Sequence, residues 1–222
     1  MSKEGIDLAR AFDLQLVVNR DALEKYEKLG INSQYWQIGF EPDGVGCESD
    51  LVYDVTFLAS GYSKERQDLV KQIRELDVSF ALYGSGWPQG WALGQTMYDF
   101  KEGCKCYRSA KISIGDSQWP ETGFVSNRVF QALAAGGAAL AHQYFRDMDK
   151  LGLIDGETCI IWKDFDELKK KVFYYLKHED ERRMIAKAGE KLALEKHSFD
   201  VRVKELFDMI ILGYQVEEDG WR

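Results

Sequence analysis

The strongest constraint on the fold is a regular alternation of short apolar runs and amphipathic helix patterns that begins at residue 53. Short apolar runs that are followed by helices are typical of parallel strands covered on both faces. The expected strands are 53–59, 78–83, 111–114, 138–141 and 159–162, and the expected helices are 63–76, 126–135, 166–176, 179–195 and 199–213. The sequence therefore predicts an α/β fold, a Rossmann-like parallel sheet flanked by helices.

A shorter strand–helix–strand pattern precedes this alternation. Residues 13–18 form an apolar strand pattern, and a charged helix that ends at Gly30 follows it. Residues 41–50 are rich in acids and turn formers, which is typical of a linker. We therefore expect two parts: residues 1–45, a strand–helix–strand piece with its linker, and residues 46–222, the Rossmann-like domain.

The net charge of -8 disfavours a nucleic-acid partner, because phosphate backbones repel an acidic protein unless it carries a basic stripe. The densest basic run, Lys169–Lys171, lies among acids and is typical of a solvated helix face. No apolar run approaches the ~18 residues that a membrane span needs, and the N-terminus has no signal-peptide pattern. We expect a cytoplasmic protein without a membrane span.

The residues that commonly bind metals are scattered. The cysteines are Cys47, Cys104, Cys106 and Cys159, and the histidines are His142, His178 and His197. No second pair completes a tetrahedral set around Cys104 and Cys106, so reduced structural thiols are favoured. The run Asp147-Met148-Asp149 matches a manganese-binding DxD pattern, but basic residues flank it and we expect no metal site there.

The segment from Ser126 to Gly136 carries the clearest binding signal. Ser126 is a good N-cap for a helix whose free amides and positive dipole end point to the carboxyl edge of the sheet, where an anion binds readily. Arg128 adds a cation that can donate a fork of hydrogen bonds to a phosphate. A buried helix with a surface arginine explains the same pattern equally well.

Two other strand-to-helix turns reach the same edge. The turn Ser60-Gly61-Tyr62, with Arg66 behind it, has two equally supported interpretations. It borders a bound sugar or its phosphates, or it is a plain tight turn without a ligand. His142 follows the end of a strand and faces the expected pocket. Its imidazole would donate or accept a hydrogen bond with the sugar, or act as a base.

The glycine-rich run Gly84-Ser85-Gly86-Trp87 also follows a strand directly. Its backbone has room to approach a ligand, but Gln89 replaces the third glycine of a dinucleotide fingerprint. This disfavours a nucleotide-dependent oxidoreductase. Trp87 and Trp91 would either stack on a base or pack against the protein, and packing is the more common outcome for such residues.

Three segments together carry a resemblance to a known family. They are 126–136 (SNRVFQALAAG), 53–66 (YDVTFLASGYSKER) and 195–202 (EKHSFDVR). With them, residues 12 to 212 resemble the CgeB/YkvP-like spore-protein glycosyltransferases, which belong to the GT-B glycosyltransferases, glycosyl transferases group 1. The resemblance is strongest over the arginine-led helix and its glycine end.

The resemblance implies a GT-B C-terminal half that binds a nucleotide sugar, most often UDP-linked, as its substrate, with no essential metal and no other cofactor. Arg128 and the amides near Ser126 and Asn127 would hold the diphosphate, and Arg128 would stabilise its charge during transfer. Gln131 stands where the family usually has a glutamate that contacts the ribose. The further contacts implied are the 60–62 turn and Arg66 near the phosphates, and Trp87 near the base. Beside the resemblance, the position of Gly84 and Gly86 after a strand makes them candidates for contact with the nucleotide, and the position of His142 at a strand end makes it a candidate for contact with the sugar.

The N-terminal part departs from the resemblance. Residues 1–45 correspond only to a remnant of the N-terminal half, the side that binds the acceptor in GT-B enzymes. The chain would then be a naturally short version, a fragment of a longer enzyme, or a subunit whose acceptor side comes from a partner chain or from a homodimer. A non-catalytic nucleotide-binding module or subunit that needs a partner chain is the alternative to a glycosyltransferase that transfers sugar to an unknown acceptor.

Overall fold

The computed structural model describes residues 3–42, 45–46, 49–94, 100–120 and 122–212, and in these residues it contains two sheets. The small sheet is a parallel pair of β1 (Gln15–Val17) and β2 (Ser33–Tyr35). The large sheet contains β3 (Tyr53–Leu58), β4 (Phe80–Tyr83), β5 (Ala110–Gly115), β6 (Ala139–Gln143) and β7 (Ile160–Trp162). Its order is β4-β3-β5-β6-β7 and every pair is parallel, which confirms the expected α/β fold.

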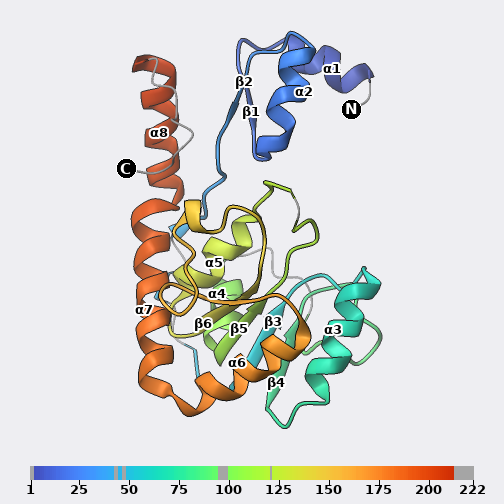
Figure 1. The fold of residues 1–222 in the computed structure, drawn as a ribbon, viewed down its shortest axis with the longest axis vertical. Helices are drawn as coiled ribbons and strands as arrows, with labels where there is room; N and C mark the ends of the chain where they lie inside the picture. Colours follow the sequence, from blue (N-terminus) through green and yellow to red (C-terminus); the bar gives the residue numbers. More distant parts are fainter. Residues whose placement is uncertain (1–2, 43–44, 47–48, 95–99, 121, 213–222) are drawn as a thin grey trace.

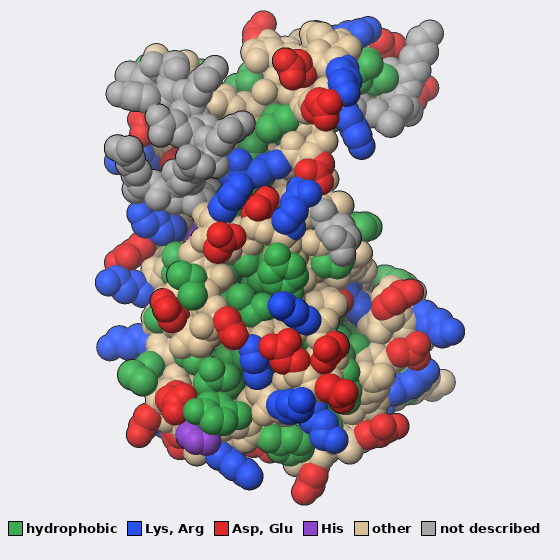
Figure 2. Space-filling view, viewed as in Figure 1, with side chains coloured by type: hydrophobic (Ala, Val, Ile, Leu, Met, Phe, Trp, Pro, Cys, Tyr) green, Lys and Arg blue, Asp and Glu red, His purple; other side chains and the backbone are tan. Residues whose placement is uncertain are grey.

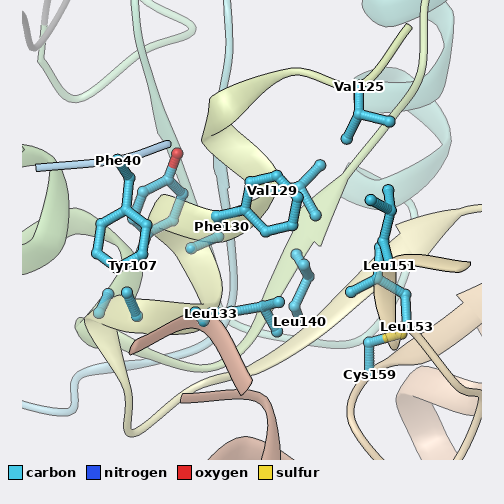
Figure 3. Close-up of a cluster of buried hydrophobic side chains, with 14 of the residues drawn as sticks. Phe40, Tyr107, Val125, Val129, Phe130, Leu133, Leu140, Leu151, Leu153 and Cys159 are labelled. Carbon is cyan, nitrogen blue, oxygen red and sulfur yellow. The ribbon is translucent and has the colours of Figure 1, made fainter. Parts of the chain in front are cut away.

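Helices cover both faces of the large sheet (Figure 1). They are α3 (Lys64–Arg74), α4 (Phe100–Arg108), α5 (Asn127–Ala135), α6 (Phe165–Lys177), α7 (Glu179–Lys196) and α8 (Phe199–Leu212), with α1 (Lys3–Arg10) and α2 (Leu23–Lys28) beside the small sheet. Residues of α4 and α5 form one apolar cluster with one face of the sheet, and residues of α3 and α6 form another with the opposite face. Figure 3 shows Val129, Phe130 and Leu133 of α5 directed into the first cluster.

Three helices begin at the carboxyl edge of the sheet with a side-chain cap. The hydroxyl of Ser63 accepts a hydrogen bond from the amide of Arg66 (3.3 Å), and the hydroxyl of Ser126 accepts one from the amide of Arg128 (3.3 Å). The carboxylate of Asp164 does the same at the start of α6. The caps expected at Ser63 and Ser126 are confirmed, and they place the free amides of α3 and α5 beside the ends of the strands.

Two helices were not expected from the sequence, α1 and α4. Helix α4 contains Cys104 and Cys106, whose side chains are buried and reduced, as expected for structural thiols. The buried residues of α4, Gly103, Cys104, Cys106 and Tyr107, share one face of the helix, although glycine and cysteine are poor helix formers. Its buried residues pack against α5 and β3, so tertiary contacts stabilise a helix that the local sequence favours weakly.

The small sheet lies at one end of the molecule with α1 and α2, and α8 extends toward the same end (Figure 1). Its contacts with the rest come from few residues. The Trp36 indole donates to the carbonyl of Arg202 (3.0 Å), and the buried amide of Gln37 donates to the carbonyl of Val125 (3.3 Å). Two separate sheets agree with an N-terminal piece, while the boundary at residue 45 stays a prediction.

The surface carries acidic and basic side chains side by side on the face shown in Figure 2, and no continuous basic stripe is visible there. Among the helices of the described residues, none has the length and apolar character required to span a bilayer.

Candidate functional site

The order of the strands places a site at the ends of β3 and β5. From β3 the chain moves outward to β4 and then returns to the other side of β3 with β5, so the direction of winding reverses between these two neighbours. Ligands of open parallel sheets bind beyond the carboxyl ends of the strands at such a reversal. A cavity of about 240 Å³ lies there. Its walls include Ser60, Arg66, Asp116, Ser126, Arg128 and His142.

One wall of the cavity is an ion pair between Arg66 and Asp116. The guanidinium donates two hydrogen bonds to the carboxylate, from Nε (2.7 Å) and Nη2 (2.9 Å). Its Nη1 donates to the carbonyl oxygen (3.2 Å) and hydroxyl (3.0 Å) of Ser60. The two charged side chains are only 13% and 11% exposed. Since an arginine has five N–H donors, these contacts leave Arg66 little capacity for a phosphate.

In contrast to Arg66, Arg128 is exposed and has donors available for a ligand. It lies in the first turn of α5, its side chain is exposed, and it lines the cavity. No carboxylate of the described residues lies within salt-bridge distance of its guanidinium. Behind it, burial raises the pKa of the Tyr107 phenol, an effect that the charge of Arg128 partly opposes, so Tyr107 is neutral. Of the two arginines that line this cavity, Arg128 is thus the one that the described residues leave available for an anionic ligand.

His142 lies at the end of β6 and is 4% exposed. Its Nδ1 is 2.6 Å from the carbonyl oxygen of Gln143, so the proton is on Nδ1 and Nε2 is a hydrogen-bond acceptor. Burial lowers the pKa of the imidazole, while the hydrogen bond to Gln143 and the charge of Asp116 raise it in part. Around neutral pH, His142 therefore accepts hydrogen bonds as a neutral ring that lines the cavity.

Five of the expected contact residues pack together farther along the edge. The Trp87 ring contacts Phe57 and Trp91, with centroids 6.1 and 6.5 Å away, and its Nε1 donates to the carbonyl of Ala59 (3.0 Å). A side chain at Gly61 would meet this ring, one at Gly86 would meet the ring of Tyr62, and one at Gly84 would meet the backbone of Ala59. Packing of the Trp87 ring against Phe57 and Trp91 is the outcome that the sequence favoured for it. A contact between these glycines or Trp87 and a base stays a prediction.

Asn127 and Gln131 are half-buried residues of α5 that do not line the cavity. The ribose contact of Gln131 stays a prediction. The sequence analysis missed Asp116, which contacts Arg66 and lines the cavity. The signal that would have found it is its position immediately after an apolar strand, where an acid lies at the carboxyl edge.

The two aspartates of the DxD run lie in a turn with basic side chains beside them. Asp147 has a left-handed backbone (φ 64°) and precedes a short 3₁₀ turn, Asp149–Leu151, so the pair is not on one α-helix. Arg146 and Lys150 approach the carboxylate of Asp147 to 3.6 Å. Over the part of the chain that the structure describes, no group of three or more His, Cys, Asp or Glu side chains is placed to hold a metal ion.

Comparison with known proteins identifies the class. The sequence of residues 65–208 matches the family described as glycosyl transferase-like. This match spans more than half of the chain, and it includes Arg66, Asp116, Arg128 and His142. The protein belongs to this glycosyl transferase-like family. No curated protein matches it in sequence.

Solved structures share the fold at low sequence identity. HepE of Anabaena, in complex with UDP and glucose, has a TM-score of 0.69 at 10% identity and is matched over 94% of this chain and 66% of its own. Sucrose-phosphate synthase of Thermosynechococcus elongatus has a TM-score of 0.66 at 13% identity, over 95% of this chain and 61% of its own. The pneumococcal O-GlcNAc transferase GtfA, in complex with UDP and GlcNAc, has a TM-score of 0.61 at 12% identity, over 96% and 47%. The chain spans less than two thirds of the length of these neighbours.

Proposed function

We propose that this chain is the donor-binding half of a GT-B glycosyltransferase and holds the diphosphate of a UDP-linked sugar at the start of α5. The observation that carries the proposal is the exposed Arg128, which no carboxylate of the described residues pairs with, beside the cap Ser126, on a cavity at the winding reversal of the sheet. Free amides of a helix start and an adjacent guanidinium together form a strong anion site. The structural neighbours with UDP support this choice of donor.

The proposed reaction is transfer of the sugar to an acceptor hydroxyl. The bond between the anomeric carbon and the diphosphate oxygen breaks, a bond to the acceptor oxygen forms, UDP leaves, and the proton of the acceptor hydroxyl passes to solvent. Negative charge then grows on the diphosphate. Arg128 and the α5 amides stabilise this charge from fixed positions, and this supplies the electrostatic part of catalysis without an essential metal.

We assign His142 to positioning of the sugar. Its pKa is lowered by burial, so it is a weak base, but its Nε2 accepts a hydrogen bond from a sugar hydroxyl without a change of protonation. The neutral ring also avoids a second positive charge in the cavity. Among glycosyltransferases, the arginine-led helix SNRVFQALAAG supports the finer assignment to the CgeB/YkvP-like enzymes.

Calorimetric titration with UDP, UDP-glucose and uridine tests the proposal. We expect UDP and UDP-glucose to bind and uridine to bind far more weakly, since it lacks the phosphates. Arg128→Ala should weaken UDP binding about 10- to 100-fold, because a hydrogen bond to a charged group contributes about 1.5–3 kcal/mol. The control is Arg183→Ala, which removes an arginine on α7 whose side chain is 69% exposed, and it should leave UDP affinity unchanged. Full UDP affinity in the Arg128 variant would contradict the site.

A further inference from the structure

A second and larger hollow lies next to the donor cavity. It measures about 730 Å³ and crosses the carboxyl ends of β5, β6 and β7, between the first turns of α3 and α6. We call it the outer groove. The residues that define it here are Gln72, Gln118, Trp119, Gln143, Lys163 and Phe165. Arg66 and Asp116 line both the outer groove and the donor cavity, so molecules in the two spaces lie next to each other.

Trp119 is the largest apolar side chain that the outer groove presents to solvent. Its side chain is 56% exposed, although a tryptophan gains much from burial. The ring is held in place by an edge-on contact with Phe124, at 5.7 Å between centroids and 80° between planes. The carbonyl of Trp119 also accepts hydrogen bonds from the amide (3.1 Å) and hydroxyl (3.0 Å) of Thr122. A fixed, exposed aromatic face is a stacking surface for a flat apolar face of a ligand.

Three amide side chains line the same groove as this ring: Gln72, Gln118 and Gln143. The Oε1 of Gln143 accepts a hydrogen bond from the amide of Ser117 (3.3 Å), which leaves its NH₂ group for another partner. Gln72 and Gln118 form no side-chain hydrogen bond within the described residues, and both are exposed. Each amide offers two donors and an acceptor, a set that matches adjacent hydroxyl groups.

The charges in the outer groove disfavour an anionic ligand. The guanidinium of Arg66 is neutralised by Asp116, and the ammonium of Lys163 lies 5.8 Å from the centre of the Tyr144 ring. The carboxylate of Asp164 is occupied as the cap of α6, and Glu65 adds an exposed negative charge. The groove therefore lacks the free cationic fork that recognises a phosphate or carboxylate.

We propose that the outer groove binds a neutral carbohydrate acceptor, with one sugar ring stacked on Trp119 and its hydroxyls bonded to Gln118 and Gln143. This inference rests on the proposed function, because it assigns the acceptor class for a donor held by Arg128. It differs from the expectation that the acceptor side lies on the N-terminal half, since the outer groove belongs to the large-sheet domain. The shared wall of Arg66 and Asp116 places such an acceptor beside the sugar of the donor. The acceptor is a neutral sugar and not an acidic one.

Saturation-transfer NMR and calorimetry on the protein saturated with UDP test this assignment. The ligands are neutral methyl glycosides and disaccharides, with methyl glucuronide as the acidic comparison. We expect at least one neutral saccharide to bind. Trp119→Ala should weaken it at least 10-fold, Trp119→Phe should weaken it less, and both variants should keep UDP affinity within about twofold. The control, Phe207→Ala, removes an exposed aromatic ring on α8 and should change neither affinity.

The contrary results distinguish a wrong assignment of the outer groove from a wrong assignment of the donor site. UDP binding without binding of any neutral saccharide would overturn the assignment of the groove and leave the donor site intact. Equal loss of UDP and saccharide in Trp119→Ala, or tighter binding of methyl glucuronide, would also overturn it. Saccharide binding that depends on Trp119 in a protein that does not bind UDP would support the carbohydrate groove and contradict the proposed donor function.

Discussion

The turns β3–α3 and β5–α5 are built alike and end in different electrostatic states. Each runs from a parallel strand into a helix, each helix is capped by a serine hydroxyl, and each carries an arginine in its first turn. Arg66 of the first turn is 13% exposed and bound to Asp116. Arg128 of the second is exposed, and no carboxylate in the described part of the chain pairs with it.

The difference shows that the local pattern does not determine the role of an arginine. Asp116 follows β5, which is the neighbour of β3 in the sheet, so tertiary structure brings a carboxylate to Arg66. Arg128 follows the same β5–α5 turn as Asp116, but no carboxylate of the described residues pairs with it. We infer that Arg66 holds the wall of the cavity together and that Arg128 binds the ligand.

The largest expected effect comes from removal of the charge on Asp116. In Asp116→Asn the free energy of unfolding should fall by about 2–4 kcal/mol, because Arg66 would retain a poorly hydrated charge without its partner. Urea unfolding followed by circular dichroism measures this loss. The matched control is Asp68→Asn, since Asp68 pairs with Lys71 on an exposed helix surface, and we expect no measurable change there. Equal effects of the two substitutions would mean that the Arg66 pair is no more important than a surface pair.

The double variant Arg66→Met/Asp116→Leu separates a structural role of Arg66 from a binding role. Replacement of both charges by apolar groups should bring the free energy of unfolding back to within about 1 kcal/mol of the wild type, because no unpaired charge remains. UDP affinity should stay within about threefold of the wild type. Calorimetry of this variant beside Arg128→Ala gives the answer: a loss as large as that of Arg128→Ala would show that Arg66 also binds the phosphates.

Much of the fold followed from local sequence signals. The strands of the large sheet and the helices α3, α5, α6, α7 and α8 lie within a few residues of their expected bounds, because apolar periodicity and serine caps are local features. Helix α4 was missed although its buried residues follow helical spacing, because Gly103 and the cysteines are poor helix formers. The packing of Cys104 and Tyr107 against the rest of the core has no local signal in the sequence.

The residues of the candidate site were also predictable only where they are close together in the sequence. Ser126 and Arg128 were predicted at the cavity because cap and cation lie within one turn of the same helix. The pairing of Arg66 with Asp116 depends on which strands are neighbours, and the two residues are 50 positions apart. Trp87 was an ambiguous case in the sequence, and its contacts with Phe57 and Trp91 are packing contacts. The roles of Asn127 and Gln131 stay predictions.

Substitution of the two serine caps tests whether the β3–α3 and β5–α5 turns contribute equally to stability and to UDP binding. Ser63→Ala and Ser126→Ala should each lower the free energy of unfolding by about 1 kcal/mol, the usual cost of a lost N-cap. Only Ser126→Ala should also weaken UDP binding, by a few fold, because only α5 points its amides at the proposed diphosphate. Urea unfolding and calorimetry on both variants measure the two effects. A loss of UDP affinity in Ser63→Ala alone would place the anion at α3 and reverse the comparison.

The smallest expected effect concerns His142, at the end of β6. The charge of Asp116 raises its pKa and the charge of Arg66 lowers it. Its pKa is lower in the folded protein than the value of about 6.5 in an unfolded chain, so the unfolded state takes up the proton first. The free energy of unfolding therefore keeps the full contribution of the neutral His142 above about pH 6.5. As the pH falls from about 6.5 toward the lower pKa of the folded state, this contribution is lost.

In urea unfolding between pH 7.5 and 5.5, the wild type should lose more stability than His142→Gln, by no more than about 1.4 kcal/mol per pH unit. His197, whose pKa burial lowers to about 3, is present in both proteins and contributes the same slope to each, so the difference between the two curves reports His142. Parallel curves would mean that His142 titrates at its ordinary pKa. A proton would then sit on His142 in mildly acidic solution, and its charge would act with Arg128 on the diphosphate in place of the neutral contact to the sugar.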